Sequence, residues 1–258
     1  MDDTSEKWDA RAGQYQESFE NGANDYNRRL LDFLDARCGL GAGLRVLDIG
    51  CGVGKYGAML LRLGCVVTLT DISPEMLRLA RINLAAEGEN WRTITGDFAA
   101  VPEAELAAGG KFGLSMSTMS PGVRDAETVA KMSRVTGGLC FLARFHSWDA
   151  PLEREFTRAM GLPEKPGKRD LAADCADMER FVREAGYEPE TTLADYDWAD
   201  RRSSAECAAR FCDRYFDGEA GEDMKKAALA AAENMAGEDG TVLDEVRTKA
   251  EWIWWRTE

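Results

Sequence analysis

The feature that most constrains the fold of this chain is a short apolar run followed by glycines, RVLDIGCGVGKYG at residues 45–57. Residues 46–49 have the apolar, β-branched character of a buried parallel strand. Gly50, Gly52 and Gly54 follow at alternate positions, and glycine reaches backbone angles closed to other residues and lets a ligand approach the main chain. The next residues return to a helix-compatible pattern. The segment therefore predicts a strand, a glycine turn and a helix, which together cradle nucleotide-like ligands in α/β proteins.

Two kinds of nucleotide ligand are compatible with this cradle. Gly52, Gly54 and Gly57 formally satisfy the G-x-G-x-x-G pattern of dinucleotide-binding domains, and Asp71 lies about 20 residues further on. However, Asp48 lies inside the predicted strand, where it would face a pyrophosphate with a like charge. A carboxylate at this place favours a ligand that carries a positive charge, such as the ammonium group of an amino acid.

The full pattern, a hydrophobic run, an acid and glycines beginning at Gly50, resembles the first motif of the class I S-adenosylmethionine (SAM)-dependent methyltransferases. The resemblance implies a doubly wound α/β fold with a mostly parallel, seven-stranded sheet. It implies SAM as cofactor, S-adenosylhomocysteine as product, and no metal. Residues in this motif would bind the cofactor, namely Asp48, Gly50, Cys51, Gly52 and Gly54. A nicotinamide or flavin domain is the less favoured alternative.

The resemblance continues at the next two predicted strands, near residues 65–70 and 91–95. The first ends on Asp71, which by the resemblance accepts hydrogen bonds from both ribose hydroxyls, and Ile72 would lie against the adenine. After the second strand, Asp97 would accept a hydrogen bond from the adenine amino group, with Phe98 near the ring. A Gly-Asp pair alone indicates only a turn. Its ordered spacing after the other two motifs favours the binding site.

We expect one domain over residues 1–258, in three parts. N-terminal helices occupy residues 1–40, the SAM-binding core residues 41–160, and a C-terminal part residues 161–258. A helical insertion at about 201–240 is expected to separate the last two strands.

An amphipathic helix is predicted at the N-terminus, where Trp8, Ala12 and Tyr15 recur at helical spacing. The spacing is satisfied by a helix that simply packs on the domain. It also resembles the W-x-x-x-A-x-x-Y segment that folds over the SAM site as a lid in small-molecule methyltransferases. In that case Tyr15 would contact the cofactor.

The loop after the fourth predicted strand bears on the methyl acceptor. Its sequence from Ser117 lacks the Asn/Asp-Pro-Pro-aromatic segment frequent in enzymes that methylate amide or exocyclic amino nitrogens. Ligands of such sheets bind beyond the carboxyl ends of the strands, so Ser117 is expected near the cofactor and Met119, Ser120 and Trp148 near the acceptor. His146 could act as a general base, although an ordinary loop histidine satisfies the same sequence.

Composition narrows the class of protein further. The net charge of −14 disfavours nucleic acid as the acceptor. No apolar run is long enough to span a membrane and the N-terminus is not a signal peptide, so we expect a cytoplasmic protein. Seven cysteines without a C-x-x-C pair, and the single histidine His146, predict reduced thiols and no structural zinc.

The predicted activity is SAM-dependent methyl transfer to a small molecule by in-line displacement. SAM already carries an activated methyl group, so alignment of the acceptor can contribute about 7–11 kcal/mol to lowering the barrier without a sharp catalytic constellation. The alternative is a non-catalytic module that binds SAM or its product in a regulatory or scaffolding role. The oligomeric state is left open.

Overall fold

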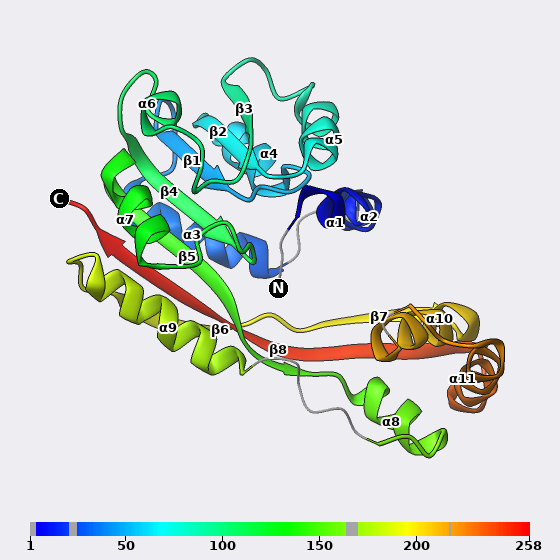
Figure 1. Cartoon of the computed structure of the whole chain (residues 1–258). Helices are drawn as coiled ribbons and strands as arrows, with labels where there is room; N and C mark the ends of the chain where they lie inside the picture. The colour runs from blue at the N-terminus through cyan, green and yellow to red at the C-terminus, as the bar shows by residue number, and fades with distance from the viewer. Residues whose placement is uncertain (1–3, 21–24, 164–169, 217) are drawn as a thin grey trace. The chain divides into compact units, whose positions relative to one another are not determined.

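Two units make up the chain, coloured along the sequence in Figure 1. The computed structural model describes residues 4–20, 25–163, 170–216 and 218–258. The first unit comprises residues 1–144, 175–194 and 251–258, and the second comprises residues 145–174 and 195–250. The single domain expected from the sequence stays a prediction.

A mostly parallel sheet organises the first unit. Its strands are β1 (Arg45–Ile49), β2 (Val66–Asp71), β3 (Trp91–Thr95), β4 (Phe112–Thr118), β5 (Thr136–Asp149), β6 (Glu190–Asp195) and β8 (Thr241–Arg256). The described strands follow the order β3-β2-β1-β4-β5-β8-β6. β1 pairs in parallel with β2 on one side and with β4 on the other. The predicted doubly wound, mostly parallel α/β class is confirmed, but the sheet has eight described strands instead of seven, because β7 (Trp198–Ser203) pairs with β8 off this path.

The strand order reverses direction at β1, because the chain moves outward to β2 and β3 and then returns to β4 on the opposite side. At such a reversal the connections leave a crevice beyond the carboxyl ends of the two central strands. The ends of β1 and β4, and of β2 beside β1, therefore define where a ligand is expected. Every cofactor residue predicted from the glycine motif lies at this edge.

Helices from distant parts of the sequence cover the sheet of the first unit. They are α3 (Asp25–Cys38), α4 (Lys55–Arg62), α5 (Pro74–Leu84), α6 (Glu103–Leu106), α7 (Ala126–Val135) and α9 (Leu171–Glu184). One buried cluster joins Leu47 and Ile49 of β1 to Met132 of α7 and Val182 of α9. Because side chains alternate along a strand, Asp48 between these two apolar neighbours faces the other way.

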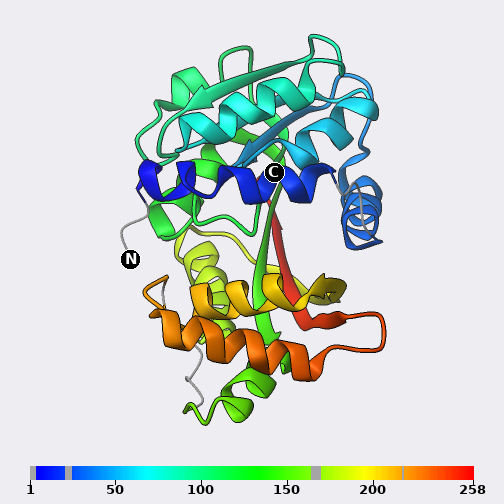
Figure 2. The ribbon, with the colours of Figure 1, turned by 90° about the vertical axis from the view of Figure 1, so that its right-hand side faces the viewer.

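The N-terminal helices α1 (Ser5–Asp9) and α2 (Ala12–Glu20) lie beside α5, as Figure 2 shows. Ala12 is fully buried in a small cluster with Val53 and Met76. Asp9 Oδ1 accepts hydrogen bonds from Ser73 Oγ at 2.5 Å and from the backbone N–H of Glu75 at 3.1 Å. The first helix therefore docks on the N-terminus of α5, where a carboxylate is also favoured by the helix dipole.

The second unit contains the helices α8 (Pro151–Ala159), α10 (Ser204–Tyr215) and α11 (Glu222–Met235) and the strand β7 (Trp198–Ser203). Phe156 and Phe211 stack at 4.5 Å between ring centroids in its apolar core. The helical insertion expected at about 201–240 is present as α10 and α11. However, the prediction missed β7, which pairs antiparallel with β8. Its sequence WADRRS is polar and largely exposed, so it carries no strand alternation to detect.

All seven cysteines lie in the described part of the chain and are thiols, as predicted. Burial raises the pKa of the Cys140 thiol to about 12, so this side chain behaves as an inert core residue. Among the described helices, none combines the length and the apolar character that a membrane crossing requires.

A glycine in α4 tests the helix–strand packing. A Cβ at Gly57 would come within 2.7 Å of Leu69 Cδ2, and Leu69 is fully buried. We expect Gly57→Val to lower the free energy of unfolding by about 1–3 kcal/mol through overpacking. Gly13→Val is the matched control, because Gly13 is also helical but a Cβ added there would meet nothing within 4 Å, and should change it by less than about 0.5 kcal/mol. Urea unfolding compares the two, and equal losses would contradict the packing argument.

Candidate functional site

The glycine turn after β1 is shaped by its neighbours. The backbone N–H groups of Gly50 and Cys51 both donate to the carbonyl oxygen of Thr70, at 2.7 and 3.0 Å. Gly50, Gly52 and Gly54 have φ values of +70°, +54° and +85°, which favour glycine. At Gly50 there is also no room for a side chain, since a Cβ would lie 1.7 Å from Ser120 Oγ.

Asp71, at the end of β2, connects the glycine turn to the start of α5. Its Oδ2 accepts a hydrogen bond from Gly52 N at 2.9 Å, and its Oδ1 accepts one from Ser73 N at 2.9 Å. Burial raises the pKa of Asp71, and these backbone donors oppose that rise. The carboxylate is thus held in one orientation, and each oxygen retains a lone pair for another donor.

Asp48, the residue before the last of β1, has a buried carboxylate. It is 1% exposed, and neither carboxylate oxygen has a hydrogen-bond partner among the described residues. Burial, and then the nearby charge of Asp71, raises the pKa of Asp48 to about 7. A buried, unpaired carboxylate is costly, so its presence at the ligand edge indicates a partner with positive charge.

Two hydroxyl groups at the same edge are also buried without a partner in the described part of the chain, Thr70 Oγ1 and Ser117 Oγ. Thr70 is the register partner of Ile49, the last residue of β1, and Ser117 lies near the end of β4. Unsatisfied polar atoms are rare in folded proteins and call for an explanation. Together with the carboxylate of Asp48, these hydroxyl groups lie near the carboxyl ends of three adjacent strands, β2, β1 and β4, where a polar ligand would satisfy them.

The residues predicted to contact adenine lie beyond β2 and β3. Ile72 is half-buried next to Asp71. Asp97 is half-buried and forms a bidentate ion pair with Arg124, which lowers the pKa of its carboxyl group. Phe98 is 2% exposed and belongs to the main apolar core, with the ammonium group of Lys131 5.1 Å from its ring centroid. Its side chain therefore supports the loop from inside the core.

The loop after β4 is held in a strained conformation. Met119 has φ +51°, a left-handed value uncommon for residues other than glycine, and its N–H donates to the carbonyl oxygen of Ala143 at 2.9 Å. Arg144, at the end of the first-unit part of β5, ties the two ends of this loop together by donating to the carbonyl oxygens of Ser117, Ala143 and Val123 at 3.1, 2.9 and 2.8 Å. Burial lowers the pKa of Arg144 to about 10.

Ser120 and Tyr15, two further predicted site residues, differ in exposure: Ser120 is buried and Tyr15 is exposed. Ser120 is buried against Gly50, and its Oγ accepts a hydrogen bond from Gly122 N at 3.2 Å. Tyr15 is 41% exposed, and its ring contacts Trp8 edge-on at 6.3 Å between centroids. Burial raises the pKa of the Tyr15 phenol, and the charge of Asp71 adds to that rise.

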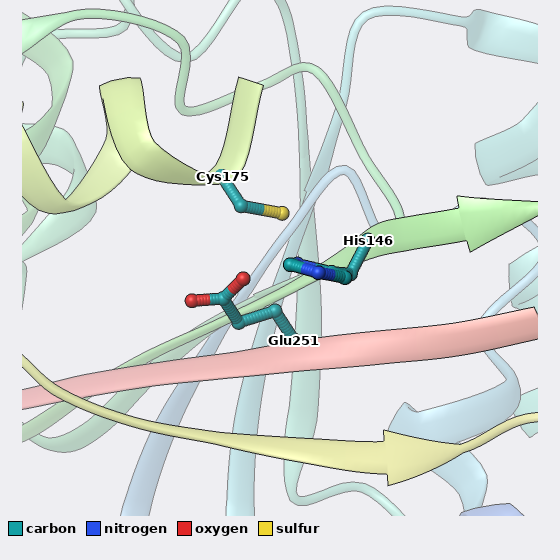
Figure 3. Close-up of side chains that lie close together, drawn as sticks. All are labelled: His146, Cys175 and Glu251. Carbon is teal, nitrogen blue, oxygen red and sulfur yellow. The ribbon is translucent and has the colours of Figure 1, made fainter. Parts of the chain in front are cut away.

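His146 and Trp148 belong to the second unit, in which Trp148 contacts Phe145 and Trp198 at 5.3 and 5.1 Å between ring centroids. Within the first unit, the thiol of Cys175 on α9 and a carboxylate oxygen of Glu251 on β8 lie within 4.8 Å of each other. Figure 3 draws this pair together with His146. The roles of His146, Trp148 and the other predicted site residues stay predictions.

Sequence reasoning missed several residues that shape this edge. They are the carboxylate of Asp9 and the three buried or loop-binding cations, Arg124, Lys131 and Arg144. Each acts through a tertiary contact with a residue far away in the chain. The sequence offered one indication for Asp9, since this residue lies in the segment from Trp8 to Tyr15 that predicted the N-terminal helix. No sequence pattern pointed to the three basic residues.

The fold and this edge define a class I, Rossmann-like domain, and comparison with known proteins agrees. Residues 46–137, less than half of the chain, match a family model described as "Methyltransferase domain". These residues run from β1 to the start of β5 and include the glycine turn, Asp71 and Asp97. Residues 46–137 thus match the model of a methyltransferase domain, in agreement with the resemblance seen in the sequence.

Individual relatives match either a short segment or the fold. The ubiquinone biosynthesis O-methyltransferase of Xanthomonas oryzae pv. oryzae is 47% identical over 53 residues, which is 20% of this chain and 22% of that protein. The match therefore spans about a fifth of the relative's length. A proposed methyltransferase of Bacillus halodurans C-125 shares the fold with a TM-score of 0.53 and 17% identity, covering 91% of this chain and 99% of that one. The YcgJ protein of Bacillus subtilis also shares the fold, with a TM-score of 0.53 and 15% identity. That match covers 89% of this chain and 98% of the YcgJ chain.

The pH dependence of stability tests the state of Asp48. Folding raises its pKa from an ordinary value of about 4 to about 7, so the folded chain binds a proton in this window that the unfolded chain has lost. The free energy of unfolding therefore falls as pH rises from about 4 to about 7. Asp48→Asn should flatten this part of the profile and, at pH 8, stabilise the ligand-free chain by about 1–3 kcal/mol.

Urea unfolding at pH 5 and pH 8 measures both effects. Asp71, whose pKa is also raised, is present in both proteins, so the difference between the two profiles reports on Asp48 and its coupling to Asp71. If the free energy of unfolding changes with pH equally in the variant and the wild type, the charge of Asp48 is already balanced in the ligand-free chain.

Proposed function

We propose that the first unit binds SAM at the carboxyl ends of β1, β2 and β4, and that the protein transfers the methyl group of SAM to a small molecule. The observation that carries this proposal is the buried carboxylate of Asp48, which has no partner in the described residues. A ligand with an ammonium and a sulfonium group supplies the positive charge that this carboxylate needs. A pyrophosphate would instead bring negative charge close to this carboxylate and repel it.

The residues present fit SAM along the edge. Asp48 would attract the amino group of the methionine part, and Asp71 would accept hydrogen bonds from the ribose hydroxyls with the lone pairs its backbone donors leave unused. The main chain at Gly52 is accessible, since a Cβ there would meet only Met76 Sδ at 3.9 Å. Ile72 and Asp97 would flank the adenine.

When bound, SAM supplies a methyl group already activated by the sulfonium. The task left to the protein is to align the acceptor and exclude water, and alignment alone can contribute about 7–11 kcal/mol. The strained loop that contains Met119 and Ser120, fixed by Arg144, is suited to hold an acceptor in one orientation. We assign Met119, Ser120 and Trp148 to the acceptor side, and His146 as a general base.

A small molecule is the proposed acceptor for two reasons. The relative in Xanthomonas is named for O-methylation in ubiquinone biosynthesis, which is chemistry on a small molecule. The net charge of −14 also opposes binding to nucleic acid. We place the activity in the cytoplasm.

Calorimetry with SAM, S-adenosylhomocysteine and NAD tests the proposal directly. We expect SAM and its product to bind, and NAD to bind far more weakly or not at all. Incubation with a metabolite extract and methyl-labelled SAM then tests transfer. Tighter binding of NAD would overturn the proposal, whereas SAM binding with no labelled product from any extract would favour a regulatory or scaffolding module.

Removal of the predicted ribose acid should weaken cofactor binding. Asp71→Ala would lose two charge-assisted hydrogen bonds, each worth about 1.5–3 kcal/mol, so affinity for SAM should fall at least about 100-fold. Asp32→Ala is the control, because Asp32 is an exposed residue of α3 that belongs to none of the predicted binding motifs. Calorimetry measures both variants. Unchanged SAM affinity in a folded Asp71→Ala protein would remove Asp71 from the site.

The docking of α1 on α5 allows a gentle test of the lid. Asp9→Ala removes the acceptor of the hydrogen bonds from Ser73 and Glu75. If the N-terminal helices cover SAM, this variant should bind SAM several-fold more weakly and lose more methyl transfer than thermal stability, because water exclusion suffers first.

Glu6→Ala on the same helix is the matched control for Asp9→Ala, since Glu6 is exposed. Its SAM affinity and activity should equal those of the wild type. Full activity of Asp9→Ala would assign α1 and α2 to packing alone.

A further inference from the structure

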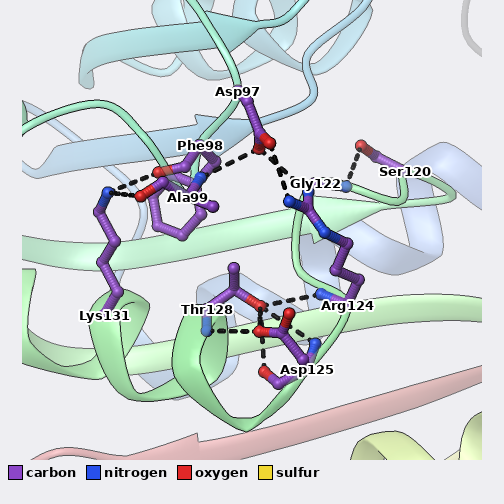
Figure 4. Close-up of polar contacts among 9 residues, drawn as sticks. All are labelled: Asp97, Phe98, Ala99, Ser120, Gly122, Arg124, Asp125, Thr128 and Lys131. Atoms are coloured by element: carbon purple, nitrogen blue, oxygen red, sulfur yellow. Dashed lines mark hydrogen bonds and ion pairs between the residues drawn. The ribbon is translucent and has the colours of Figure 1, made fainter. Parts of the chain in front are cut away.

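The loop that follows β3 carries a carboxylate held on both oxygens. Arg124 Nη1 donates to Asp97 Oδ1 at 3.0 Å and Arg124 Nη2 donates to Asp97 Oδ2 at 2.8 Å, as Figure 4 shows. Ala99 N also donates to Oδ1, at 3.0 Å. This planar, two-point contact fixes both the position and the rotation of the carboxylate, which a single donor would not.

The backbone of the same loop is held independently by Lys131 of α7. Its ammonium group, almost fully buried, donates to the carbonyl oxygens of Phe98 and Ala99 at 2.6 and 2.9 Å and also to that of Val101. The loop therefore does not need Arg124 to keep its backbone in place. What Arg124 adds is control of the Asp97 side chain.

Arg124 is itself placed by the start of α7. Its backbone N–H and that of Asp125 donate to Thr128 Oγ1 at 3.0 and 3.1 Å, and Thr128 N donates to Asp125 Oδ1 at 2.8 Å. This reciprocal capping box fixes the residue immediately before the helix. The guanidinium group thus reaches Asp97 from a rigid base.

The contacts leave one oxygen of Asp97 partly unused. Oδ1 accepts from both Arg124 and Ala99, whereas Oδ2 accepts only from Arg124 among the described residues. A carboxylate oxygen has two lone pairs, so Oδ2 can accept one further N–H group. The ion pair is half-exposed, and pairs of this kind contribute little to stability. Orientation of the carboxylate is the stronger reason for the arrangement.

We propose that Arg124 is a positioning residue for the base of the cofactor: it holds Asp97 so that Oδ2 accepts a hydrogen bond from a 6-amino group and rejects a 6-oxo group. The inference rests on the proposed function, because it requires a nucleoside at this edge of the first unit. A 6-oxo oxygen would face the carboxylate with like partial charge and without a proton, which disfavours it. Arg124 therefore makes the site selective for adenosyl over inosyl ligands without touching the ligand.

The test compares S-adenosylhomocysteine with S-inosylhomocysteine, which differ at position 6 of the base, by calorimetry on the full chain. For the wild type we expect the adenosyl ligand to bind at least tenfold more tightly. Arg124→Gln should reduce this ratio to about two or below, mainly by weakening the adenosyl ligand. Arg124→Lys keeps the charge but not the two-point contact, so it should give an intermediate ratio.

Arg134→Gln is the matched control. Arg134 lies on α7, the helix that Arg124 precedes, and pairs with Glu103 at 2.6 Å in an exposed ion pair that does not involve Asp97. Its ratio should equal that of the wild type. Thermal unfolding of each variant shows that all are folded at the temperature of the measurement.

A wild-type ratio kept in Arg124→Gln, or lost equally in Arg134→Gln, would overturn the inference and leave SAM binding intact. An increase in adenosyl affinity in Arg124→Gln would also overturn it, because Arg124 would then block the site. A wild-type chain that binds neither ligand would overturn the proposed function itself, and the positioning role with it.

Discussion

The structure depends on a concentration of negative charge at one edge of a parallel sheet. Asp48 and Asp71 lie near the ends of adjacent strands and are both buried, and burial, followed by the charge of Asp71, raises the pKa of Asp48. Asp9, brought in by the N-terminal helix, adds to the same field and raises the pKa of Asp71 further. Backbone N–H groups satisfy Asp71 but not Asp48. Protonation of Asp48 or a bound cation relieves this repulsion, and the proposed sulfonium ligand would supply a cation.

The surrounding elements keep these acids in place before any ligand arrives. The glycine turn can follow its path because Gly50 leaves room for Ser120, and its amides are anchored on the carbonyl group of Thr70. Asp71 then bridges that turn to the first residues of α5. Because each loop is bonded to its neighbour, binding does not have to order them, and affinity follows from preorganised groups.

The sequence could predict this edge because its residues come in a fixed order along the chain. A strand, a glycine turn, an acid after the second strand and another after the third were readable, and they lie where predicted in the fold. The role of Arg124 could not be predicted from the sequence, because it comes from a contact with Asp97 that forms only in the folded chain. The same holds for Asp9. β7 escaped for a different reason, since a polar, exposed strand has no buried face to leave a period-two pattern.

Three basic residues of the first unit fix loops at the ligand edge, although they bind different groups. Lys131 and Arg144 donate mainly to backbone carbonyl groups and thereby fix the loops after β3 and β4, whereas Arg124 binds a carboxylate. A cation that binds carbonyl groups leaves nearby acids unpaired, so the negative field of Asp48 and Asp71 is not cancelled from within. Asp97, which is paired with Arg124, lies where the proposed ligand would present a neutral base. Asp48, which has no partner among the described residues, lies where the proposed ligand would be cationic, so at these two acids the pairing follows the proposed charge of the ligand.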